Sequence, residues 1–351
     1  MSGNAARRRS NALGSGSASF GALISFKVAG GCRFGRDGEG QMSPNLDSGA
    51  PAAMTLNVRH VTTYRYAREV ALGEHRMMMR PRDGYDQRLL SAELVVEPRP
   101  ARLRWVYDPF DNCVALATFS GASSFLRIES AFAVERTADE SPGGEIDPRA
   151  REYPFSYLPE ELPDISRSIE RLYDDPGGDL ERWARRFLGG KTLTSTLLMT
   201  MTYTIKESFA YQRREEAGVQ PPTQTLELRR GSCRDFAVLM MEAARALGIA
   251  ARFVSGYVYV PRGEGEELRV GGGATHAWCQ VYLPGAGWIE FDPTNGLIGG
   301  KDLIRVAVAR DPAQAAPLTG TYFGRLEDEL GMEVSVEVKQ PKRLESVSSA
   351  T

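Results

Sequence analysis

The stretch from Ser232 to Gly248 constrains the fold more than any other part of the chain, because it carries a complete set of helix signals. Ser232 and Asp235 stand three residues apart in the Ser-x-x-acid pattern that caps a helix N-terminus. Gly248 provides a stop signal at the other end. Apolar residues recur between them with helical spacing, at Phe236, Leu239, Met240, Ala243, Ala244 and Leu247. The pattern predicts a helix that starts at Cys233 and buries one long apolar face.

Cys233 would be the first residue of this helix, where unpaired amides and the helix dipole favour negative charge. A thiol at this position is biased toward the thiolate, and Gly231 leaves room for a substrate to approach the sulfur. The alternative is a small buried apolar residue, which the local sequence taken alone favours. We interpret Asp235 as the capping partner of Ser232 rather than as a catalytic acid or a calcium ligand, since the sequence has no calcium-loop pattern.

Two later segments supply partners for Cys233. Residues 275–283 (THAWCQVYL) and 288–293 (WIEFDP) alternate as strands do, and a Pro-Gly-Ala-Gly turn separates them. The two segments predict a hairpin with His276 and Asp292 on adjacent strands and on one polar face. Cys233, His276 and Asp292 would then supply a nucleophile, a base and an orienting acid for attack on a carbonyl carbon. The backbone amide of Cys233 is a candidate oxyanion-hole donor.

The patterning of the whole chain divides it into five parts and indicates an α+β fold class. Residues 1–53 are rich in Gly, Ser and Arg and predict a disordered extension, with a targeting peptide as the alternative and Met54 as a candidate start. Residues 54–140 alternate as strands between turns, which indicates a small β-sandwich-like domain. Residues 141–165 have linker composition, and residues 166–338 carry helical stripes followed by strands. Residues 339–351 are polar and predict a frayed tail.

Composition limits the classes of function. The chain has 351 residues, 42% of them hydrophobic, and a net charge of −2 with basic and acidic residues interspersed, so we expect no nucleic-acid partner. No apolar run reaches the roughly 18 residues of a membrane span, so we expect no membrane partner either. Four scattered cysteines do not make a disulfide framework, and they favour a reducing, cytoplasmic location.

Longer motifs around the three residues resemble the transglutaminase-like superfamily. They read GVQPP from Gly218, GSCRDFAVLM from Gly231, RALGIAARFVSGY from Arg245, and THAWCQVYLPGAGWIEFDPTNG from Thr275. Earlier segments (MTLNVRHVTTYRY, EH, MRPR and DPFDN) resemble the β-rich N-terminal domain of bacterial transglutaminase-like proteins. Asp111 stands where that family often has Gly before Asn, and Asp also tolerates a positive φ.

The resemblance runs from about Met54 past residue 330. It implies a papain-like core that acts on amide bonds through a thioacyl intermediate, with Cys233, His276 and Asp292 as the catalytic residues. The superfamily includes cross-linking enzymes, peptidases, amidases and inactive relatives. The resemblance therefore specifies the reaction mechanism better than it specifies the substrate.

The remaining chemistry-bearing residues have plainer interpretations. His60 and His75 are expected to be structural, because no nucleophile accompanies them. Residues 77–79 (MMM) are expected to fill a core or an interface. Cys279 could complete a zinc set with Cys233, His276 and Asp292, but strand alternation sends it to the opposite face from His276. We expect no metal and no cofactor.

Two further features of the sequence have both a functional and a structural interpretation. Trp278 and Trp288 could wall an acyl-binding cleft or belong to the core. The glycine-rich run from Gly263 to Gly273 lacks a phosphate-binding signature, and we interpret it as a connection beside the cleft that enters the strand of His276. Glycine permits hinge motion, so a gating role is the functional alternative.

The sequence thus predicts a cysteine-dependent enzyme, a transglutaminase-like peptidase or amidase that acts on peptide or isopeptide amides of a peptide or protein substrate. Water is the default acyl acceptor, since no amine-acceptor site is recognisable. The first alternative is a protein-glutamine γ-glutamyltransferase that cross-links proteins, and the second is a non-catalytic binding scaffold. The substrate, the acceptor and the oligomeric state are not specified by the sequence.

Overall fold

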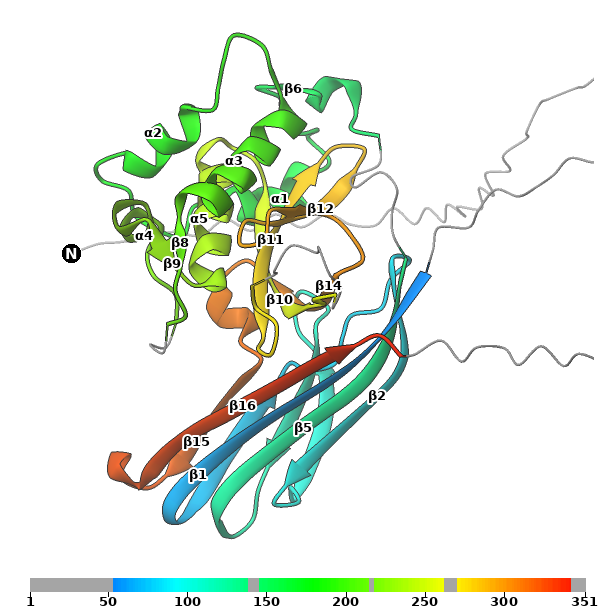
Figure 1. Cartoon of the computed structure of the whole chain (residues 1–351), viewed down its shortest axis with the longest axis vertical. Helices are drawn as coiled ribbons and strands as arrows, with labels where there is room; N and C mark the ends of the chain where they lie inside the picture. Colours follow the sequence, from blue (N-terminus) through cyan, green and yellow to red (C-terminus); the bar gives the residue numbers. More distant parts are fainter. Residues whose placement is uncertain (1–52, 138–144, 215–217, 262–269, 342–351) are drawn as a thin grey trace, which may run out of the picture. The chain divides into compact units, whose positions relative to one another are not determined.

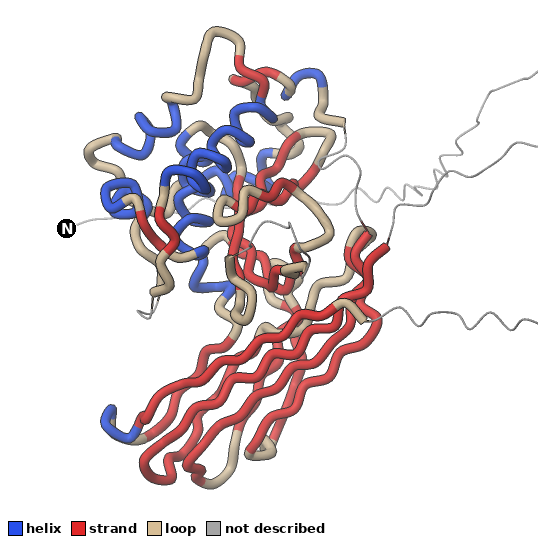
Figure 2. Tube along the Cα trace, viewed as in Figure 1, coloured by secondary structure: helices blue, strands red, loops and turns tan. Residues whose placement is uncertain are grey.

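A computed structural model describes residues 53–137, 145–214, 218–261 and 270–341 (Figure 1). The expected N-terminal extension, apart from Ala53, and the end of the expected tail lie outside these residues. Figure 2 separates a part made of strands from a part that mixes helices and strands. The fold is α+β, with a core of helices on an antiparallel sheet and a curled antiparallel sheet before it, which confirms the predicted fold class.

The strand-rich part is one antiparallel sheet in which β1 is central. Its strands are β1 (Ala53–Met77), β2 (Gln87–Glu97), β3 (Arg102–Tyr107), β4 (Cys113–Thr118), β5 (Ala122–Thr137), β15 (Leu318–Phe323) and β16 (Glu329–Lys339). β4 and β5 pair in succession with one edge of β1, while β15 and β16 pair in succession with the other. β2 and β3 likewise follow one another along β5 and β4. The sheet therefore consists of four long strand paths.

These long paths fold back on themselves. Met77 pairs with Ala115 at one end of the sheet, whereas Gln87 pairs with Arg136 at the other end. A flat strand of 25 residues would be about 80 Å long, but the segment 78–86 that joins these two ends can span only about 30 Å. The register of β1 breaks between Arg65 and Val70, where the path bends. The two halves enclose an apolar cluster, which is the expected sandwich-like core: Tyr66, Val70, Leu72, Met77, Met79, Val96, Ala115, Ala117, Leu126 and Ile128.

The C-terminal strands β15 and β16 differ from the expected division of the chain. Residues up to 338 were expected in the catalytic core, but Leu318–Lys339 pairs with β1 and extends the N-terminal sheet. The physical reason is that β1 would otherwise expose a long edge of unpaired amides and carbonyls. Backbone pairing of this kind leaves little trace in a local pattern, because the two partners stand far apart in the sequence.

The core is built on a five-stranded antiparallel sheet in the order β13-β12-β11-β10-β14. Its strands are β10 (Ala251–Val258), β11 (His276–Leu283), β12 (Gly287–Asp292), β13 (Leu297–Ile298) and β14 (Leu303–Ala309). The helices are α1 (Leu162–Ile169), α2 (Asp179–Arg185), α3 (Thr194–Ser208), α4 (Pro222–Leu228) and α5 (Cys233–Ala246). The apolar face of α5 is buried against β10 and β11, as the spacing of its sequence predicts (Figure 1).

Short elements complete the description. They are the 3-10 turns η1 (Pro148–Ala150), η2 (Pro312–Ala315) and η3 (Leu326–Asp328), and the paired two-residue strands β6 (Glu152–Tyr153) with β7 (Thr192–Leu193) and β8 (Ala210–Tyr211) with β9 (Arg230–Gly231). Within the expected linker 141–165, the described part contains η1, β6 and the start of α1. No helix among the described residues is both long enough and apolar enough to cross a membrane.

Two side-chain amides join the N-terminal sheet to the outer edge of β14. Gln87 Nε2 donates to the carbonyl of Arg305 at 2.8 Å, and its Oε1 accepts from the Arg305 amide at 2.8 Å. Asn112 repeats this pairing on Val308, with hydrogen bonds of 2.7 and 2.9 Å. Both amides are fully buried. They act as a substitute strand that satisfies an edge which would otherwise be buried without partners.

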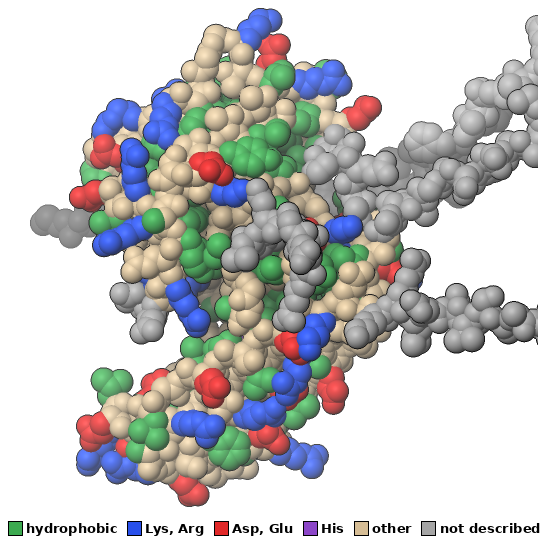
Figure 3. Space-filling model, in the orientation of Figure 1, with side chains coloured by type: hydrophobic (Ala, Val, Ile, Leu, Met, Phe, Trp, Pro, Cys, Tyr) green, Lys and Arg blue, Asp and Glu red, His purple; other side chains and the backbone are tan. Residues whose placement is uncertain are grey.

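Charged groups strengthen the same junction. Arg305 pairs with Asp86 at 2.6 Å and with Glu290 at 3.0 Å, and Arg136 reaches Asp86 at 3.0 Å. Burial raises the pKa of Asp86, but the hydrogen bonds and charges of the two arginines outweigh burial and lower it to about 2. Elsewhere on the sheet, Figure 3 shows basic and acidic side chains intermixed. Some of them pair across strands, as Arg59 and Glu129 do at 2.6 Å.

Candidate active site

The N-terminus of α5 presents Cys233 as the first helical residue, with the predicted capping box before it. One carboxylate oxygen of Asp235 accepts hydrogen bonds from the amide and the hydroxyl of Ser232, both at 2.8 Å. The other oxygen accepts from Arg214 and from the backbone amide of Gln220. Asp235 is fully buried and fully engaged, so the structure gives it the capping role that we expected.

His276 and Asp292 meet as the alternation of their strands predicts. The Nε2 atom of His276, at the start of β11, lies 2.8 Å from Oδ2 of Asp292, at the end of β12. Both side chains are completely buried. The backbone amides of Thr294 and Asn295 donate to Asp292 Oδ1 at 2.9 and 3.3 Å, so the turn after β12 also holds the carboxylate.

The thiol of Cys233 is one of the groups that raise the pKa of the His276 imidazole. Burial lowers the pKa of His276, but the charge and hydrogen bond of Asp292 and the nearby Cys233 thiol raise it more, so the net pKa is above the usual histidine value. Burial raises the pKa of Asp292, but the charge and hydrogen bond of His276, together with the hydrogen bonds from Asn295 and Thr294, outweigh burial, and the net shift is downward. The pair therefore favours imidazolium and carboxylate over two neutral groups.

The second nitrogen of His276 is the one left for the sulfur. Nε2 is taken by Asp292, and Nδ1 is buried without a partner of ordinary hydrogen-bond geometry among the described residues. Cys233 is 7% exposed, whereas the His276 and Asp292 side chains are not exposed at all. A substrate would therefore reach the site from the side of the sulfur.

Sequence reasoning missed three residues around this site. Asn295 hydrogen-bonds Asp292, Gly271 lies against the ring of His276, and Tyr211 lies beside Gly231 through the pairing of β8 with β9. Burial, and after it the nearby Cys233, raise the pKa of the Tyr211 phenol, so this side chain lies close to the sulfur. Of the three, only Asn295 lies in a segment that the sequence marks as a turn, since Asp, Pro and Asn are common turn residues.

Other candidates lie away from the three residues. Cys279 faces the α5 side of the sheet, where its thiol donates to the carbonyl of Phe291, and burial raises the pKa of this thiol.

The two histidines of the N-terminal sheet make structural hydrogen bonds. His60 bonds the Tyr257 hydroxyl at 2.8 Å, where the N-terminal sheet meets the core, and His75 bonds the carbonyl of Gly73 within that sheet. Met77, Met78 and Met79 are core residues of two clusters, as we expected.

The two tryptophans take different places. Trp278 is fully buried in a cluster with β10 and β14 and stacks on His276, with ring centroids 5.9 Å apart. Trp288 is half-buried beneath the guanidinium of Arg252, 4.0 Å from its ring centre. Trp278 is thus a core residue that supports His276 rather than an exposed wall. Residues 263–269 of the glycine-rich run lie outside the described residues.

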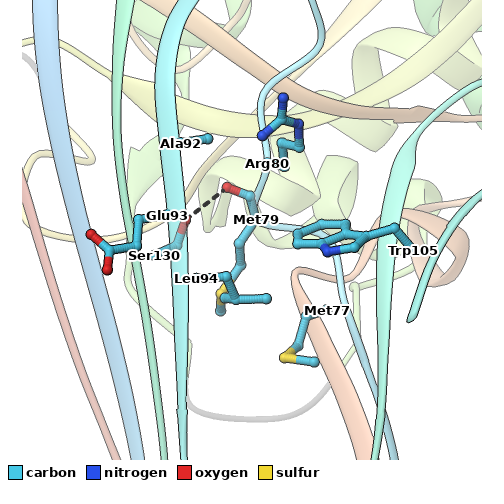
Figure 4. Close-up of a pocket in the computed structure, with 8 residues that line it drawn as sticks. All are labelled: Met77, Met79, Arg80, Ala92, Glu93, Leu94, Trp105 and Ser130. Atoms are coloured by element: carbon cyan, nitrogen blue, oxygen red, sulfur yellow. Dashed lines mark hydrogen bonds between the residues drawn. The ribbon is translucent and has the colours of Figure 1, made fainter. Parts of the chain in front are cut away.

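Two hollows in the N-terminal sheet are separate from this site. The smaller, of about 20 Å³, lies where Met77 and Met79 pass between Leu94 and Trp105, and Figure 4 shows Ser130 bonded to the carbonyl of Met79 beside it. The larger, of about 430 Å³, extends from Arg80 along β2 toward Tyr107. None of Cys233, His276 and Asp292 lines either hollow.

A helix that begins with Cys233 packs on an antiparallel sheet that carries the His276–Asp292 pair, and this arrangement is consistent with an α+β, papain-like fold. Residues 56–135 match the bacterial transglutaminase-like N-terminal region, and residues 181–293 match the transglutaminase-like superfamily. The chain thus carries a bacterial transglutaminase-like N-terminal region followed by a domain of the transglutaminase-like superfamily, and the resemblance in the sequence is confirmed.

Comparisons with individual proteins agree with these two family matches. The chain is 28% identical over 303 residues to an uncharacterized protein of Mycobacterium tuberculosis, which covers 80% of this chain and 91% of the relative. A segment of 113 residues is 33% identical to a protein-glutamine gamma-glutamyltransferase of Pseudomonas aeruginosa, covering 30% of this chain and 16% of that protein. The crystal structure of a proposed cysteine protease from Cytophaga hutchinsonii superimposes with a TM-score of 0.61 at 20% identity, over 83% of this chain and 93% of that one, which supports the fold.

Proposed function

We propose that this protein is a cysteine-dependent acyl-transfer enzyme that cleaves peptide or isopeptide amides through a thioacyl intermediate, with water as the acceptor. The observation that carries the proposal is the buried 2.8 Å hydrogen bond between His276 and Asp292, next to a thiol at the start of α5. Burying an ion pair carries a desolvation cost, and groups with strongly shifted pKa values cluster at functional sites.

In the first half of the reaction, the Sγ thiolate of Cys233 attacks the carbonyl carbon of the amide. The backbone amide of Cys233 is the proposed donor to the oxygen that becomes negative. The C–N bond then breaks, and the proton on Nδ1 of the His276 imidazolium goes to the leaving amine. The product is a thioester on Cys233 and a neutral imidazole. Asp292 holds the ring and stabilises its charged form throughout.

In the second half, water replaces the amine. Neutral His276 takes a proton from water as its oxygen attacks the thioester carbon, the C–S bond breaks, and the acid leaves while the thiolate is restored. Cys233 and His276 therefore both take part in bond making, whereas Asp292 only orients.

The direct test is a comparison of Cys233→Ala and His276→Ala with the unaltered protein on a broad panel of peptide and isopeptide amides. Near-total loss of new amino termini in both variants is expected. Equal turnover in Cys233→Ala would instead favour the binding-scaffold alternative.

The similarity to a protein-glutamine gamma-glutamyltransferase favours one second candidate, transfer of a glutamine acyl group to a lysine amine. The two reactions share the thioester and differ in the acceptor. Release of ammonia together with incorporation of an added primary amine would support cross-linking, while new amino termini would support hydrolysis.

A further inference from the structure

Asn295, in the turn after β12, contacts both oxygens of the Asp292 carboxylate. Its side-chain Nδ2 donates to Asp292 Oδ2 at 2.8 Å, and its backbone amide donates to Oδ1. Asp292 Oδ2 is the same oxygen that binds His276 Nε2. Asn295 therefore fixes the carboxylate at the atom that sets the orientation of the imidazole.

The same side chain pairs with the backbone of Val270. Asn295 Oδ1 accepts from the Val270 amide at 2.8 Å, and Nδ2 donates to the Val270 carbonyl at 3.1 Å. An amide nitrogen carries two hydrogens, so the bonds to Asp292 and Val270 use both of them. The approach of Nδ2 to His276 Nε2 at 3.4 Å is thus a contact rather than a third bond.

The segment that Asn295 holds lies directly on the histidine. Gly271 has a φ of +102°, and a Cβ at this position would stand 2.7 Å from His276 Nδ1, the nitrogen left for the sulfur. A side chain there would be strained by its backbone and would displace the ring or the segment. The backbone at Gly271 therefore packs closely against the imidazole ring, which agrees with the lack of exposure of the His276 side chain.

We propose that Asn295 is a positioning residue for the reaction of Cys233. Its side chain orients Asp292 and also holds the backbone of Val270, whose neighbour Gly271 packs against His276. One side-chain amide thus fixes both the acid and the backbone that contact the imidazole. This inference rests on the proposed function, because positioning matters only if His276 serves Cys233.

The test is the pH dependence of alkylation of Cys233 by iodoacetamide, followed by site-resolved mass spectrometry across the pH range in which the protein stays folded. The upper inflection of this rate reports where the His276 imidazolium loses its proton. In Asn295→Ala we expect this inflection to move to lower pH, because a displaced carboxylate stabilises the imidazolium less. Turnover of an amide substrate should fall about 10- to 100-fold, with little change in KM. Asn57→Ala, at an exposed position of β1, is the matched control and should change neither quantity.

Gly271→Ala provides a second and independent variant. It leaves Asn295 intact but drives a Cβ toward His276, so the same inflection should change and turnover should fall. An inflection that stays in place, or moves to higher pH, in folded Asn295→Ala overturns the positioning role. The same holds if Asn295→Ala does not fold and Gly271→Ala reacts like the unaltered protein. If Cys233 of the unaltered protein shows no imidazolium-dependent inflection at all, the proposed function fails together with this inference, so the two failures are distinguishable.

Discussion

At the scale of single residues, the buried pairing of His276 with Asp292 sets the protonation state of the imidazole near the sulfur. Burial lowers the pKa of His276, but Asp292 and then Cys233 raise it by a larger amount. The imidazolium therefore persists above neutral pH, and this is the form that can protonate a leaving amine. The structural reason is that the alternation of β11 and β12 brings both side chains to one face, 2.8 Å apart.

Asp292→Asn tests this relation. Without the carboxylate, burial dominates and the pKa of His276 falls, so the alkaline limb of kcat/KM should move to lower pH. We expect kcat/KM near neutrality to fall about 10²- to 10⁴-fold and a measurable activity to remain, since Asp292 orients rather than reacts. Initial rates over a pH series give both quantities, with Asp164→Asn on the exposed side of α1 as control. An alkaline limb that does not move would contradict the role of Asp292.

At the scale of secondary-structure elements, the pairing of β10 with β11 sets the place of His276. Gly256 of β10 pairs with His276, and the next strand, β14, runs close on the other side. A Cβ at Gly256 would meet the carbonyl oxygen of Ile304 at 2.0 Å and the ring of Trp278 at 2.8 Å. The close approach of these strands therefore requires glycine.

Gly256→Ala should lower the free energy of unfolding by about 1–3 kcal/mol or more, because the backbone of Ile304 cannot yield as a side chain can. Urea denaturation measures this change. Gly190→Ala is the matched control, since a Cβ there meets nothing within 4 Å. Equal stability of the two variants would mean that β10 and β14 are not as closely packed as described.

The elements also show how much of the fold could be predicted from sequence. The helix from Cys233 and the hairpin of His276 and Asp292 were predictable, because a capping pattern and a strand alternation are local signals. The return of β15 and β16 to β1 was not, since it depends on backbone pairing between distant segments. Asn295 was missed for a similar reason, because its role depends on Val270, 25 residues earlier, and on a glycine whose neighbour is visible only in space.

At the scale of the whole molecule, the junction between the N-terminal sheet and β14 depends on buried polar groups. Asn112→Ala should therefore cost about 1–3 kcal/mol of unfolding free energy, because the amide and the carbonyl of Val308 lose their partners in a buried place. Thermal or urea unfolding beside Asn57→Ala measures the difference. A loss no greater than that of the exposed control would argue against the substitute-strand role.

His60 makes the stability of this junction depend on pH. Burial lowers the pKa of His60 from 6.5 to about 4, so the unfolded chain binds a proton at a higher pH than the folded one. The contribution is present above pH 6.5 and is lost as the pH falls toward 4, by up to about 3 kcal/mol. His75, whose pKa is also lowered by burial, adds to the slope in the same direction. Urea unfolding at several pH values should show a shallower slope in His60→Gln, and an unchanged slope would contradict this assignment.

The central claim is that the sulfur of Cys233 is made reactive by His276. The most direct measurement is the second-order rate constant of iodoacetamide with Cys233 at neutral pH, compared with that of free glutathione and with the same position in His276→Ala. The account predicts that Cys233 reacts faster than glutathione and that this advantage disappears in His276→Ala. A rate no greater than that of glutathione, or one that is unchanged without His276, would contradict it.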